Sequence, residues 1–268
     1  MIRVNGEPRE QVTADDRGLL LGDGLFETVL VREGHACLWP WHRARLEHGL
    51  ERLGFPTQDM EDLRAEVETA GGSGERLVRL TLTRGSGPRG YAPPEHPAVT
   101  RIVSTGPALS RPAPDEVVPL RVGFADIPVS VNPALAGIKH LGRLDHVLAR
   151  MHWRAGEDEA ILRDANGRIT CATQGNLWLR EGMQLLTPPV ESAGVAGTRR
   201  AWILERAMEF GVRVVVEWPS LERLQAAEGL YVSNARLGLM PAVPGENGIM
   251  ADEPAPLQAL RRALHEAD

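Results

Sequence analysis

The sequence predicts a mixed α and β fold (α+β) arranged in two domains. Stretches that alternate apolar and polar residues, as strands do, are interspersed with stretches whose apolar residues recur every three or four positions, as in helices. The 268 residues suffice for one large or two medium-sized domains with a buried core. The segment 109–114, Leu-Ser-Arg-Pro-Ala-Pro, has the composition of a linker. We therefore expect a smaller N-terminal domain over residues 1–108, a linker over 109–116 and a larger C-terminal domain over 117–268.

The first half of the chain predicts strands and helices in alternation. The expected elements are a strand over 25–31, a helix that contains residues 42–53 and ends near 54, a helix over 58–70, and strands over 76–83 and 100–104. The first helix is predicted by Leu46, Leu50 and Leu53, which lie on one helical face. Gly54 and the pair Gly71-Gly72 follow the two helices and are typical of helix ends.

The second half repeats this mixture with a different layout. The expected elements are a helix over 144–151, hairpin strands over 159–162 and 176–179 with turns at 164–167 and 181–182, a helix over 196–210, a strand over 212–216, a helix over 221–227, a strand that ends at 231–234, and a helix over 257–265. Gly211 is a plausible cap for the helix that precedes it. We find no internal repeat and no low-complexity tract.

Composition excludes several classes of protein. A formal net charge of −6 argues against a nucleic-acid-binding protein, which normally carries a basic excess on one face. The first residues lack the apolar core of a secretory signal, and no segment has the 18 or so apolar residues that span a membrane. We therefore expect a cytoplasmic protein, in which Cys37 and Cys171 are free thiols.

The histidines do not predict a metal site. His140, His146 and His152 recur every six residues, which on a helix separates successive side chains by about 240°. They therefore cannot share a helical face. The sequence also contains no H-E-x-x-H motif and no paired Cys/His cluster.

Residues 85–90, Gly-Ser-Gly-Pro-Arg-Gly, match the G-x-G-x-x-G pattern of dinucleotide-binding loops. Such a site also needs a helix immediately after the loop, because the N-terminus of that helix binds the pyrophosphate. Residues 91–97 contain three prolines, which exclude a helix, so we reject a dinucleotide site. Arg84 and Arg89 leave two interpretations of the loop open: a site for a carboxylate, or a solvent-exposed turn.

Lys139 is the most distinctive candidate for catalysis. It lies in Gly137-Ile138-Lys139-His140-Leu141, just before the predicted helix over 144–151. Ile138 and Leu141 would desolvate the amine, which lowers the pKa of a lysine and gives a neutral nucleophile near pH 7. This chemistry suits a Schiff base, whereas a single lysine near a helix start is more often exposed to solvent.

Several short motifs, spread in order through most of the chain, together resemble those of one family. They are Asp16-Arg17-Gly18, Gly22-Asp23-Gly24-Leu25-Phe26-Glu27-Thr28, His42-x-x-Arg45-Leu46, Arg84-Gly85-Ser86-Gly87-Pro88-Arg89-Gly90-Tyr91, Gly137-Ile138-Lys139-His140-Leu141-x-Arg143-Leu144, Asn176-Leu177, Gly197-Thr198-Arg199-Arg200 and Asn234-Ala235. The chain resembles the fold-type IV pyridoxal-phosphate (PLP) enzymes. The R-G-x-G-x-R-G-Y and G-I-K-H-L-x-R-L motifs are more similar to those of 4-amino-4-deoxychorismate lyases than to those of branched-chain or D-amino-acid aminotransferases. The resemblance implies a two-domain architecture with a cofactor cleft between the domains and the Schiff-base lysine in the larger C-terminal domain.

The resemblance also implies which residues bind the cofactor, pyridoxal 5'-phosphate. Lys139 would be the Schiff-base lysine, and Arg45 would hold the phosphate, with Arg43 as the fallback. The turn Gly197-Thr198-Arg199, at the start of a predicted helix, would offer backbone N–H groups to the same phosphate, because helix N-termini favour anions. Asn234 and Ala235 complete the expected cofactor contacts.

Cys171 departs from the family pattern. These enzymes usually carry a glutamate that pairs with the pyridine nitrogen of the cofactor, and this chain has Cys171 at that position, within Ile-Thr-Cys-Ala-Thr-Gln over 169–174. A neutral thiol cannot keep the nitrogen protonated as a carboxylate does. The departure is less damaging to a lyase whose product becomes aromatic, since the product itself supplies much of the driving force.

The implied reaction converts 4-amino-4-deoxychorismate into 4-aminobenzoate and pyruvate, a step of folate biosynthesis. Lys139 would remove the proton from the amine-bearing ring carbon and donate a proton to the departing pyruvate. Arg84 and Arg89 are candidates for binding the substrate carboxylates, and Arg236 and Arg143 compete for that role. The resemblance also implies a homodimer.

Two other functions stay open at this point. A branched-chain or D-amino-acid aminotransferase of the same fold would use Lys139 in the same way but would need a protonated ring nitrogen, and Cys171 argues against it. A repurposed member with weakened cofactor binding would give a colourless protein even after PLP is added.

Overall fold

The computed structural model describes residues 1–109, 111, 113–116, 118–245 and 252–268. Ser110 and Pro112 of the predicted linker, and Val117 after it, lie outside the described residues. The chain forms two compact units. The first comprises Met1–Ser110 with Ile138–Gly142, and the second comprises Arg111–Gly137 with Arg143–Asp268.

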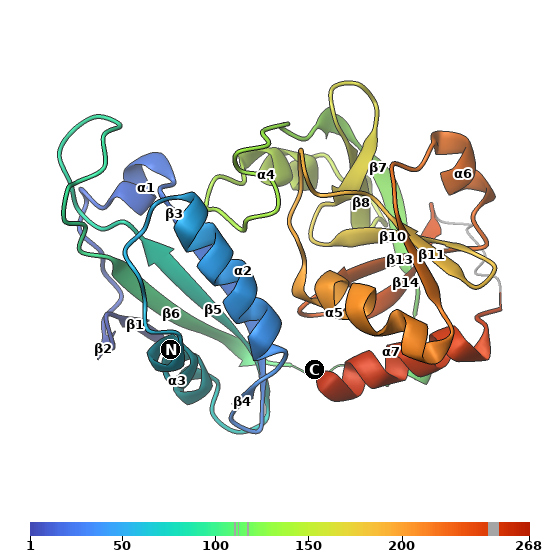
Figure 1. The fold of residues 1–268 in the computed structure, drawn as a ribbon, viewed down its shortest axis with the longest axis horizontal. Helices are drawn as coiled ribbons and strands as arrows, with labels where there is room; N and C mark the ends of the chain where they lie inside the picture. The colour runs from blue at the N-terminus through green and yellow to red at the C-terminus, as the bar shows by residue number, and fades with distance from the viewer. Residues whose placement is uncertain (110, 112, 117, 246–251) are drawn as a thin grey trace. The chain divides into compact units, whose positions relative to one another are not determined.

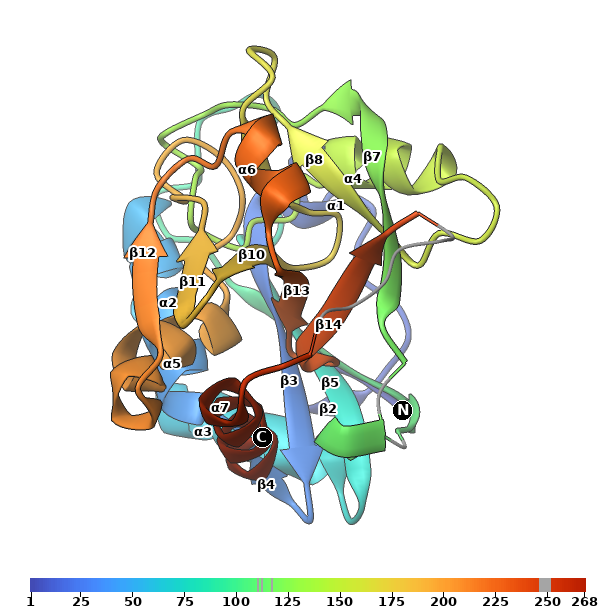
Figure 2. The same ribbon diagram turned by 90° about the vertical axis from the view of Figure 1, so that its right-hand side faces the viewer.

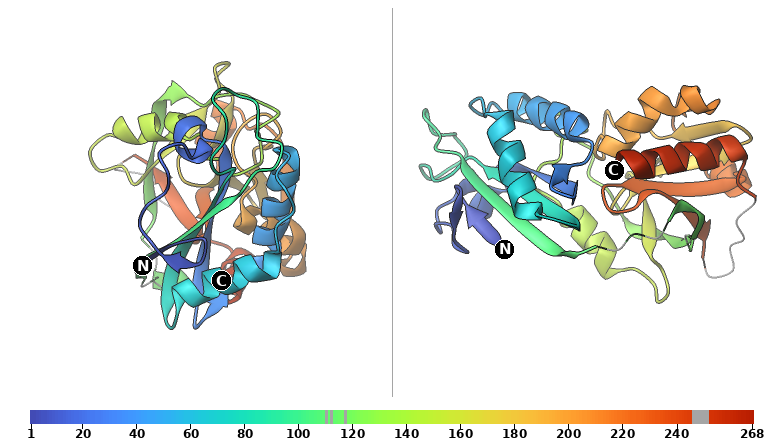
Figure 3. Two further views of the ribbon diagram at one scale, coloured as in Figure 1. Left: turned by 90° about the vertical axis from the view of Figure 1, so that its left-hand side faces the viewer. Right: turned by 90° about the horizontal axis from the view of Figure 1, so that it is seen from below.

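The first unit is a six-stranded antiparallel sheet with helices on one face. Its elements are β1 (Ile2–Val4), β2 (Glu7–Pro8), α1 (Arg17–Leu21), β3 (Gly24–Arg32), β4 (His35–Ala36), α2 (Trp39–Arg52), α3 (Met60–Gly71), β5 (Glu75–Thr83) and β6 (Thr100–Ala108). The strand order is β2-β1-β6-β5-β3-β4. Helices α2 and α3 cover the same face of this sheet, as Figures 1 and 3 show.

The core of the first unit forms where the helices meet the sheet. Fully buried apolar side chains from strands and helices fill this layer: Leu25, Val29, Val31, Leu46, Leu63, Val67, Val78, Leu80, Leu82 and Val103. Glycine permits the close approach of α2 to β3, because a Cβ at Gly49 would lie 2.8 Å from Cδ1 of Leu25. The predicted strand over 25–31 and both predicted helices are confirmed, with α3 starting at the side-chain cap Asp59.

Residues 138–142 pack with the first unit, although the sequence placed them in the C-terminal domain. Residues 138–142 pair with the first residues of β3, whereas the short strand β4 pairs with the last residues of β3. A bridge joins Leu25 to His140, the backbone N–H of Phe26 donates to the carbonyl of Lys139 (2.9 Å), and that of Leu141 donates to the carbonyl of Gly24 (3.0 Å). This long-range pairing leaves no local trace in the sequence, so the predicted division misplaced Lys139.

The second unit is built on an eight-stranded mixed sheet. Its elements are β7 (Leu120–Pro128), α4 (Leu144–Met151), β8 (Glu159–Arg163), β9 (Ile169–Ala172), β10 (Asn176–Glu181), β11 (Gln184–Thr187), α5 (Thr198–Arg206), β12 (Arg213–Val216), α6 (Leu221–Ala226), β13 (Gly229–Asn234), β14 (Gly238–Pro244) and α7 (Ala255–Ala267), with 3-10 turns η1 (Pro114–Glu116) and η2 (Ala207–Phe210). The strand order is β12-β11-β10-β13-β14-β7-β8-β9, and Figure 2 labels the strands from β12 to β7 across the unit. Helices α5 and α7 contact each other and the strands β13 and β14.

Two apolar clusters form the core of the second unit. The larger includes Leu177, Leu179, Leu186 and Val232, and the smaller surrounds Cys171. The predicted helix over 196–210 divides into α5 and η2, and Gly211 ends it with a positive φ of 73°, as its cap role requires. None of the helices in the described part of the chain combines the length and apolarity that crossing a membrane requires.

Candidate active site

Lys139 is held at the edge of β3, beside Phe26. Its Nζ lies 4.4 Å from the centre of the Phe26 ring. The preceding Ile138 is fully buried, and Lys139 itself is half-buried. The backbone on both sides is fixed by the pairing with β3. The structure therefore places this amine in a defined, partly apolar setting.

Arg79 lies over the same Phe26 ring and was missed by the sequence analysis. Its Cζ is 3.8 Å from the ring centre, and its Nε donates to Oγ1 of Thr81 (3.2 Å). Phe26 pairs with Thr81, and Thr28 with Arg79, so these side chains share one face of the sheet. Burial lowers the pKa of Arg79, and no carboxylate pairs with it among the described residues. The signal in the sequence was an arginine between two apolar residues, Val78 and Leu80, in the middle of a strand.

Arg45 belongs to a buried ionic cluster with Glu27 and His42. Its Nε donates to Oε1 of Glu27 (2.9 Å) and its Nη2 to Oε2, which also contacts Nδ1 of His42 at 2.6 Å. Glu27 and His42 are at most 1% exposed, and the side chain of Arg45 is 9% exposed. Burial alone would raise the pKa of Glu27, but Arg45 and His42 together lower it to about 2. The cluster fixes the orientation of the Arg45 guanidinium.

Arg43 does not replace Arg45 in this cluster. It is 47% exposed and forms surface ion pairs with Glu47 (2.9 Å) and Glu61 (3.4 Å). The two arginines lie two positions apart on α2, which directs them to different faces of the helix. The fallback for the phosphate-binding arginine therefore finds no support in the structure.

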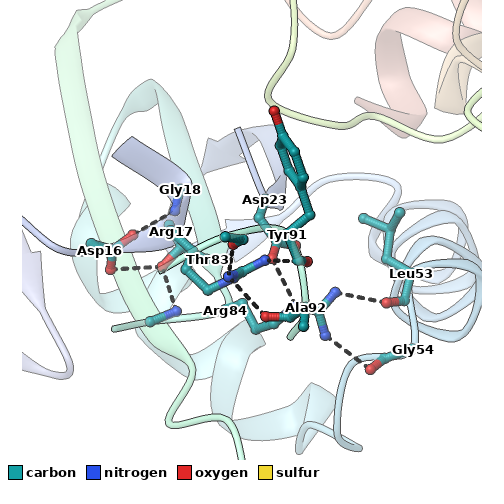
Figure 4. A network of polar contacts seen from close by, with 12 residues as sticks. Asp16, Arg17, Gly18, Asp23, Leu53, Gly54, Thr83, Arg84, Tyr91 and Ala92 are labelled. Atoms are coloured by element: carbon teal, nitrogen blue, oxygen red, sulfur yellow. Dashed lines mark hydrogen bonds and ion pairs between the residues drawn. The ribbon is translucent and has the colours of Figure 1, made fainter. Parts of the chain in front are cut away.

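Arg84 has a structural role in place of the substrate-binding role that we expected. Its Nε donates to Asp23 (2.9 Å), and its two Nη atoms donate to the carbonyls of Leu53 (2.7 Å) and Gly54 (3.0 Å), as Figure 4 shows. The guanidinium also lies 4.2 Å from the centre of the Phe55 ring. The Nη donors of the Arg84 guanidinium are therefore used to bind the carbonyls at the end of α2. Its partners are distant in the chain, so the motif alone could not show this.

Arg89 and Tyr91 face solvent on the glycine-rich loop. Tyr91 is 89% exposed, and Arg89 is also exposed. Residues 91–97 form no helix, as their prolines predict. Of the two arginines of this motif predicted for a substrate carboxylate, Arg84 and Arg89, only Arg89 has an accessible side chain.

In the second unit, the predicted phosphate-binding turn is the start of α5. Gly197 is its N-cap, no side chain caps the helix, and its first turn contains no acidic residue. A Cβ at Gly197 would lie 2.0 Å from Oδ1 of Asn176, so this position requires glycine. Asn176 donates from Nδ2 to the carbonyl of Val195 (2.8 Å), which anchors the segment before the helix. An uncapped helix start with these features suits an anion.

The arginines of α5 differ in their surroundings. Arg199 is fully buried, pairs with the buried Asp268, and donates from Nη1 to Oγ1 of Thr198 (3.0 Å). Arg200 is 7% exposed, donates from Nη2 to the carbonyl of Pro188 (3.1 Å), and has an Nε with no hydrogen-bond partner among the described residues. The guanidinium of Arg199 is therefore neutralised by a carboxylate of the protein, whereas that of Arg200 donates to a backbone carbonyl.

Cys171 lies inside the smaller apolar cluster of the second unit. It is 3% exposed, and its Sγ accepts a hydrogen bond from Oγ1 of Thr170 (3.7 Å). Burial raises the pKa of the Cys171 thiol to about 11, so the thiol is neutral at pH 7. The nearby Glu159 is also buried, and desolvation raises its pKa although backbone N–H groups of Ala160 and Gln174 donate to it.

Asn234, Ala235 and Arg236 lie in the turn between β13 and β14. The Asn234 side chain is engaged in that turn: Oδ1 accepts from the N–H groups of Arg236 and Leu237 (both 2.9 Å), and Nδ2 donates to the carbonyl of Gln174 (3.0 Å). Arg236 is exposed. The turn is thus well ordered by Asn234, whose expected contact with the cofactor stays a prediction. In the described part of the chain, no group of three or more His, Cys, Asp or Glu side chains could hold a metal ion.

Comparison with known proteins agrees with this arrangement of motifs. The model of the family described as amino-transferase class IV matches residues 24–243. The chain belongs to this family. It is 30% identical over 257 residues to an aminodeoxychorismate lyase of Vibrio harveyi, which covers 94% of this chain and 93% of that protein. It is also 30% identical over 252 residues to a putative branched-chain-amino-acid aminotransferase of Methanocaldococcus jannaschii, covering 90% and 86%.

The solved structures give the same family. The crystal structure of 4-amino-4-deoxychorismate lyase from Pseudomonas aeruginosa matches with a TM-score of 0.87 and 35% identity, over 99% of this chain and 97% of that one. The mixed α and β fold predicted from the sequence is therefore confirmed. Members of the amino-transferase class IV family typically depend on PLP.

Proposed function

We propose that this class IV protein is a PLP-dependent lyase that converts 4-amino-4-deoxychorismate into 4-aminobenzoate and pyruvate. The observation that carries the proposal is the setting of Lys139, whose amine is fixed over the Phe26 ring by pairing with β3. The similarity to two lyases across almost the whole chain supports this substrate. A homodimer is part of the same proposal.

The residues present fit the cofactor. Its phosphate is an anion, and α5 begins without a side-chain cap or an acidic residue in its first turn. Arg200, in that turn, carries a buried Nε that lacks a partner in the described chain. We infer that backbone N–H groups of Gly197, Thr198 and Arg199 hold the phosphate together with Arg45. Lys139 would hold the aldehyde, and Asn234 and Ala235 are further cofactor contacts in the same proposal.

The cofactor, when bound, supplies an electron sink for the electron pair that a departing proton leaves behind. Lys139 then does the proton chemistry. Its Nζ takes the proton from the amine-bearing ring carbon and returns one to the methylene carbon of the enolpyruvyl group as the carbon–oxygen bond breaks. The products are pyruvate and an aromatic 4-aminobenzoate, so atoms and charge balance with no other reactant.

Three arginines are candidates for the two carboxylates of the substrate. Arg79 shares the Phe26 ring with Lys139 and has no paired carboxylate among the described residues, which makes it the strongest candidate. Arg89 and Arg236 are exposed and carry the same charge. A guanidinium suits this role because it binds a carboxylate through two parallel hydrogen bonds.

Cys171 favours the lyase over an aminotransferase of the same fold. Where the family resemblance places a glutamate, the buried neutral thiol cannot keep a pyridine nitrogen protonated. Transamination depends strongly on that proton, whereas loss of pyruvate is assisted by the aromaticity of the product. The aminotransferase remains the second candidate because of the similarity to the putative Methanocaldococcus jannaschii aminotransferase.

The first experiment is an absorbance spectrum of the purified protein with and without PLP, followed by borohydride reduction and mapping of the labelled peptide. We expect a band near the visible edge that becomes fixed on Lys139, and formation of 4-aminobenzoate from 4-amino-4-deoxychorismate. Lys139→Ala should lose both. A protein that stays colourless after PLP is added would refute the proposal, and a coloured protein that only transaminates amino acids would favour the second candidate.

A further inference from the structure

The glycine-rich loop is tied to the first unit by one buried arginine. Arg17 is 4% exposed, and its guanidinium donates to three successive carbonyls of the loop: Gly90 (Nη1, 3.1 Å), Tyr91 (Nη2, 3.0 Å) and Ala92 (Nη1, 3.2 Å). Its Nε donates to Asp23 at 2.8 Å. Figure 4 shows this arrangement, with the Tyr91 ring directed away from the guanidinium.

The entry to the loop is fixed as well. The N–H of Arg17 donates to the carbonyl of Gly85 (2.9 Å), and Asp16 forms a bridge with Ser86. The Asp16 carboxylate also accepts from the hydroxyl groups of Thr83 (2.8 Å) and Thr100 (2.9 Å). Gly85 has a φ of +79°, and a Cβ there would lie 1.9 Å from the carbonyl oxygen of Ala98, so only glycine permits this entry.

Such anchoring exceeds what a solvent-exposed turn needs. The carbonyls of an exposed turn can bond to water, whereas here a guanidinium is removed from water to hold three of them. The result is a loop in which three carbonyls face the guanidinium of Arg17, while the side chains of Arg89 and Tyr91 are exposed to solvent. A loop ordered before binding loses less conformational entropy when it binds a ligand.

We propose that Arg17 is a positioning residue that holds the loop over residues 85–92 so that Arg89 and Tyr91 bind the carboxylate-bearing ring of the substrate. This inference rests on the proposed function. Arg89 supplies the charge and Tyr91 supplies a flat apolar ring with a hydroxyl. Arg17 itself does not touch the substrate, because its donors are occupied by Asp23 and by the loop carbonyls.

The test compares Arg17→Gln with Arg84→Gln as the matched control. The two arginines are equally buried and share Asp23, but Arg84 donates to Leu53 and Gly54 and not to the loop. In PLP-loaded protein, Arg17→Gln should speed amide hydrogen exchange in residues 88–93 and raise the KM for the substrate about ten-fold with kcat nearly unchanged. Arg84→Gln should lower Tm but leave loop exchange and KM as in the wild type.

A double variant separates positioning from general weakening. If Arg17 acts through Arg89 and Tyr91, Arg17→Gln should raise KM by a smaller factor in an Arg89→Gln background than in the wild type. Should Arg17→Gln fail to fold, Arg17→Lys keeps the ion pair with Asp23 but cannot span three carbonyls, and the same loss of loop protection is expected.

If amide hydrogen exchange in residues 88–93 is unchanged in both Arg17 variants, the claim that Arg17 holds the loop is wrong. Faster exchange with an unchanged KM, or an effect on KM that adds fully to that of Arg89→Gln, would overturn the role in recognition. If the wild type binds no PLP or has no lyase turnover, the proposed function fails and the substrate named here fails with it. The exchange measurement then still decides whether Arg17 holds the loop.

Discussion

Replacement of Glu27 by glutamine removes the carboxylate that Arg45 and His42 share, and we expect it to destabilise the first unit strongly. Glu27 is 1% exposed and accepts two hydrogen bonds from Arg45 and one contact from His42. The variant removes the negative charge of Glu27 from beside the Arg45 guanidinium, whose side chain is only 9% exposed. Removal of one partner of a buried ion pair costs about 3–5 kcal/mol, because the other charge stays buried.

The assay is thermal unfolding followed by circular dichroism at pH 7. At roughly 2–4 °C per kcal/mol for chains of this order of size, Tm should fall by at least about 6 °C. The control is Glu47→Gln, which removes the exposed partner of Arg43 on the same helix and should change stability by only about 0.5 kcal/mol. Equal small shifts for both variants would refute the reasoning, because burial would then have no effect on the cost.

The difference in the free energy of unfolding between wild type and Glu27→Gln should become smaller as the pH falls below 4.5. The pKa of Glu27 is lowered from 4.5 to about 2, so the stabilisation that Glu27 provides is fully present above pH 4.5 and is lost as pH falls toward 2.

The affinity of the same variant for the cofactor is a second measurement. If Arg45 binds the phosphate, the variant should weaken binding of PLP more than binding of pyridoxal, which lacks the phosphate.

Two further predictions concern Lys139 and the thiols. Gly24→Ala should displace the segment around Lys139, because the added Cβ would lie 2.3 Å from the carbonyl oxygen of Leu82 and 2.8 Å from Cδ1 of Leu141. We expect a loss of about 1–3 kcal/mol in stability and a weaker cofactor band by absorbance titration, and an unchanged band would contradict the prediction. Cys171 should resist a thiol reagent in the native protein, because it is buried and its pKa is raised to about 11. Titration should find at most one reactive thiol, Cys37, before denaturation and two afterwards, and two in the native state would disprove the burial.

The sequence predicts well the elements whose signal is local. Helix α2 and strand β3 carry regular apolar periodicities, and both lie where they are expected. Strand β14 was missed because proline argues against a strand, yet Pro241 lies opposite Tyr231 in the middle of the sheet. Helix α1 was missed because its five residues expose their leucines and show no amphipathic pattern.

In the candidate site too, the residues with a local sequence signal were predicted and those that depend on distant contacts were not. Lys139 was found because its flanking apolar residues and motif lie within a few positions of it. The commitment of Arg84 to Leu53 and Gly54 depends on contacts about 30 positions away, so a motif that contains two arginines could not show which one is free to bind a ligand. Arg79 was overlooked for a similar reason, since its proximity to Lys139 arises only when residues 138–142 pair with β3.

Cys171→Glu tests why this chain lacks a carboxylate at that position. The new side chain would enter a cluster that includes Ala125, Val129, Leu162 and Ala193, so crowding should cost about 1–3 kcal/mol. Arg143 acts electrostatically on Cys171, lowering the pKa of its thiol, and its positive charge would also attract the new carboxylate. If ring-nitrogen protonation limits transamination only, the variant should transaminate amino acids faster, while formation of 4-aminobenzoate stays level or falls.

The matched control is Cys171→Ser, which keeps a small neutral side chain and should leave both rates near those of the wild type. Proton transfer by Lys139 and the aromaticity of the product do not depend on the residue at position 171, so the lyase has little to gain from the carboxylate. A large gain in lyase turnover in Cys171→Glu would show that the thiol limits the lyase. Cys171 would then no longer favour the lyase over the aminotransferase.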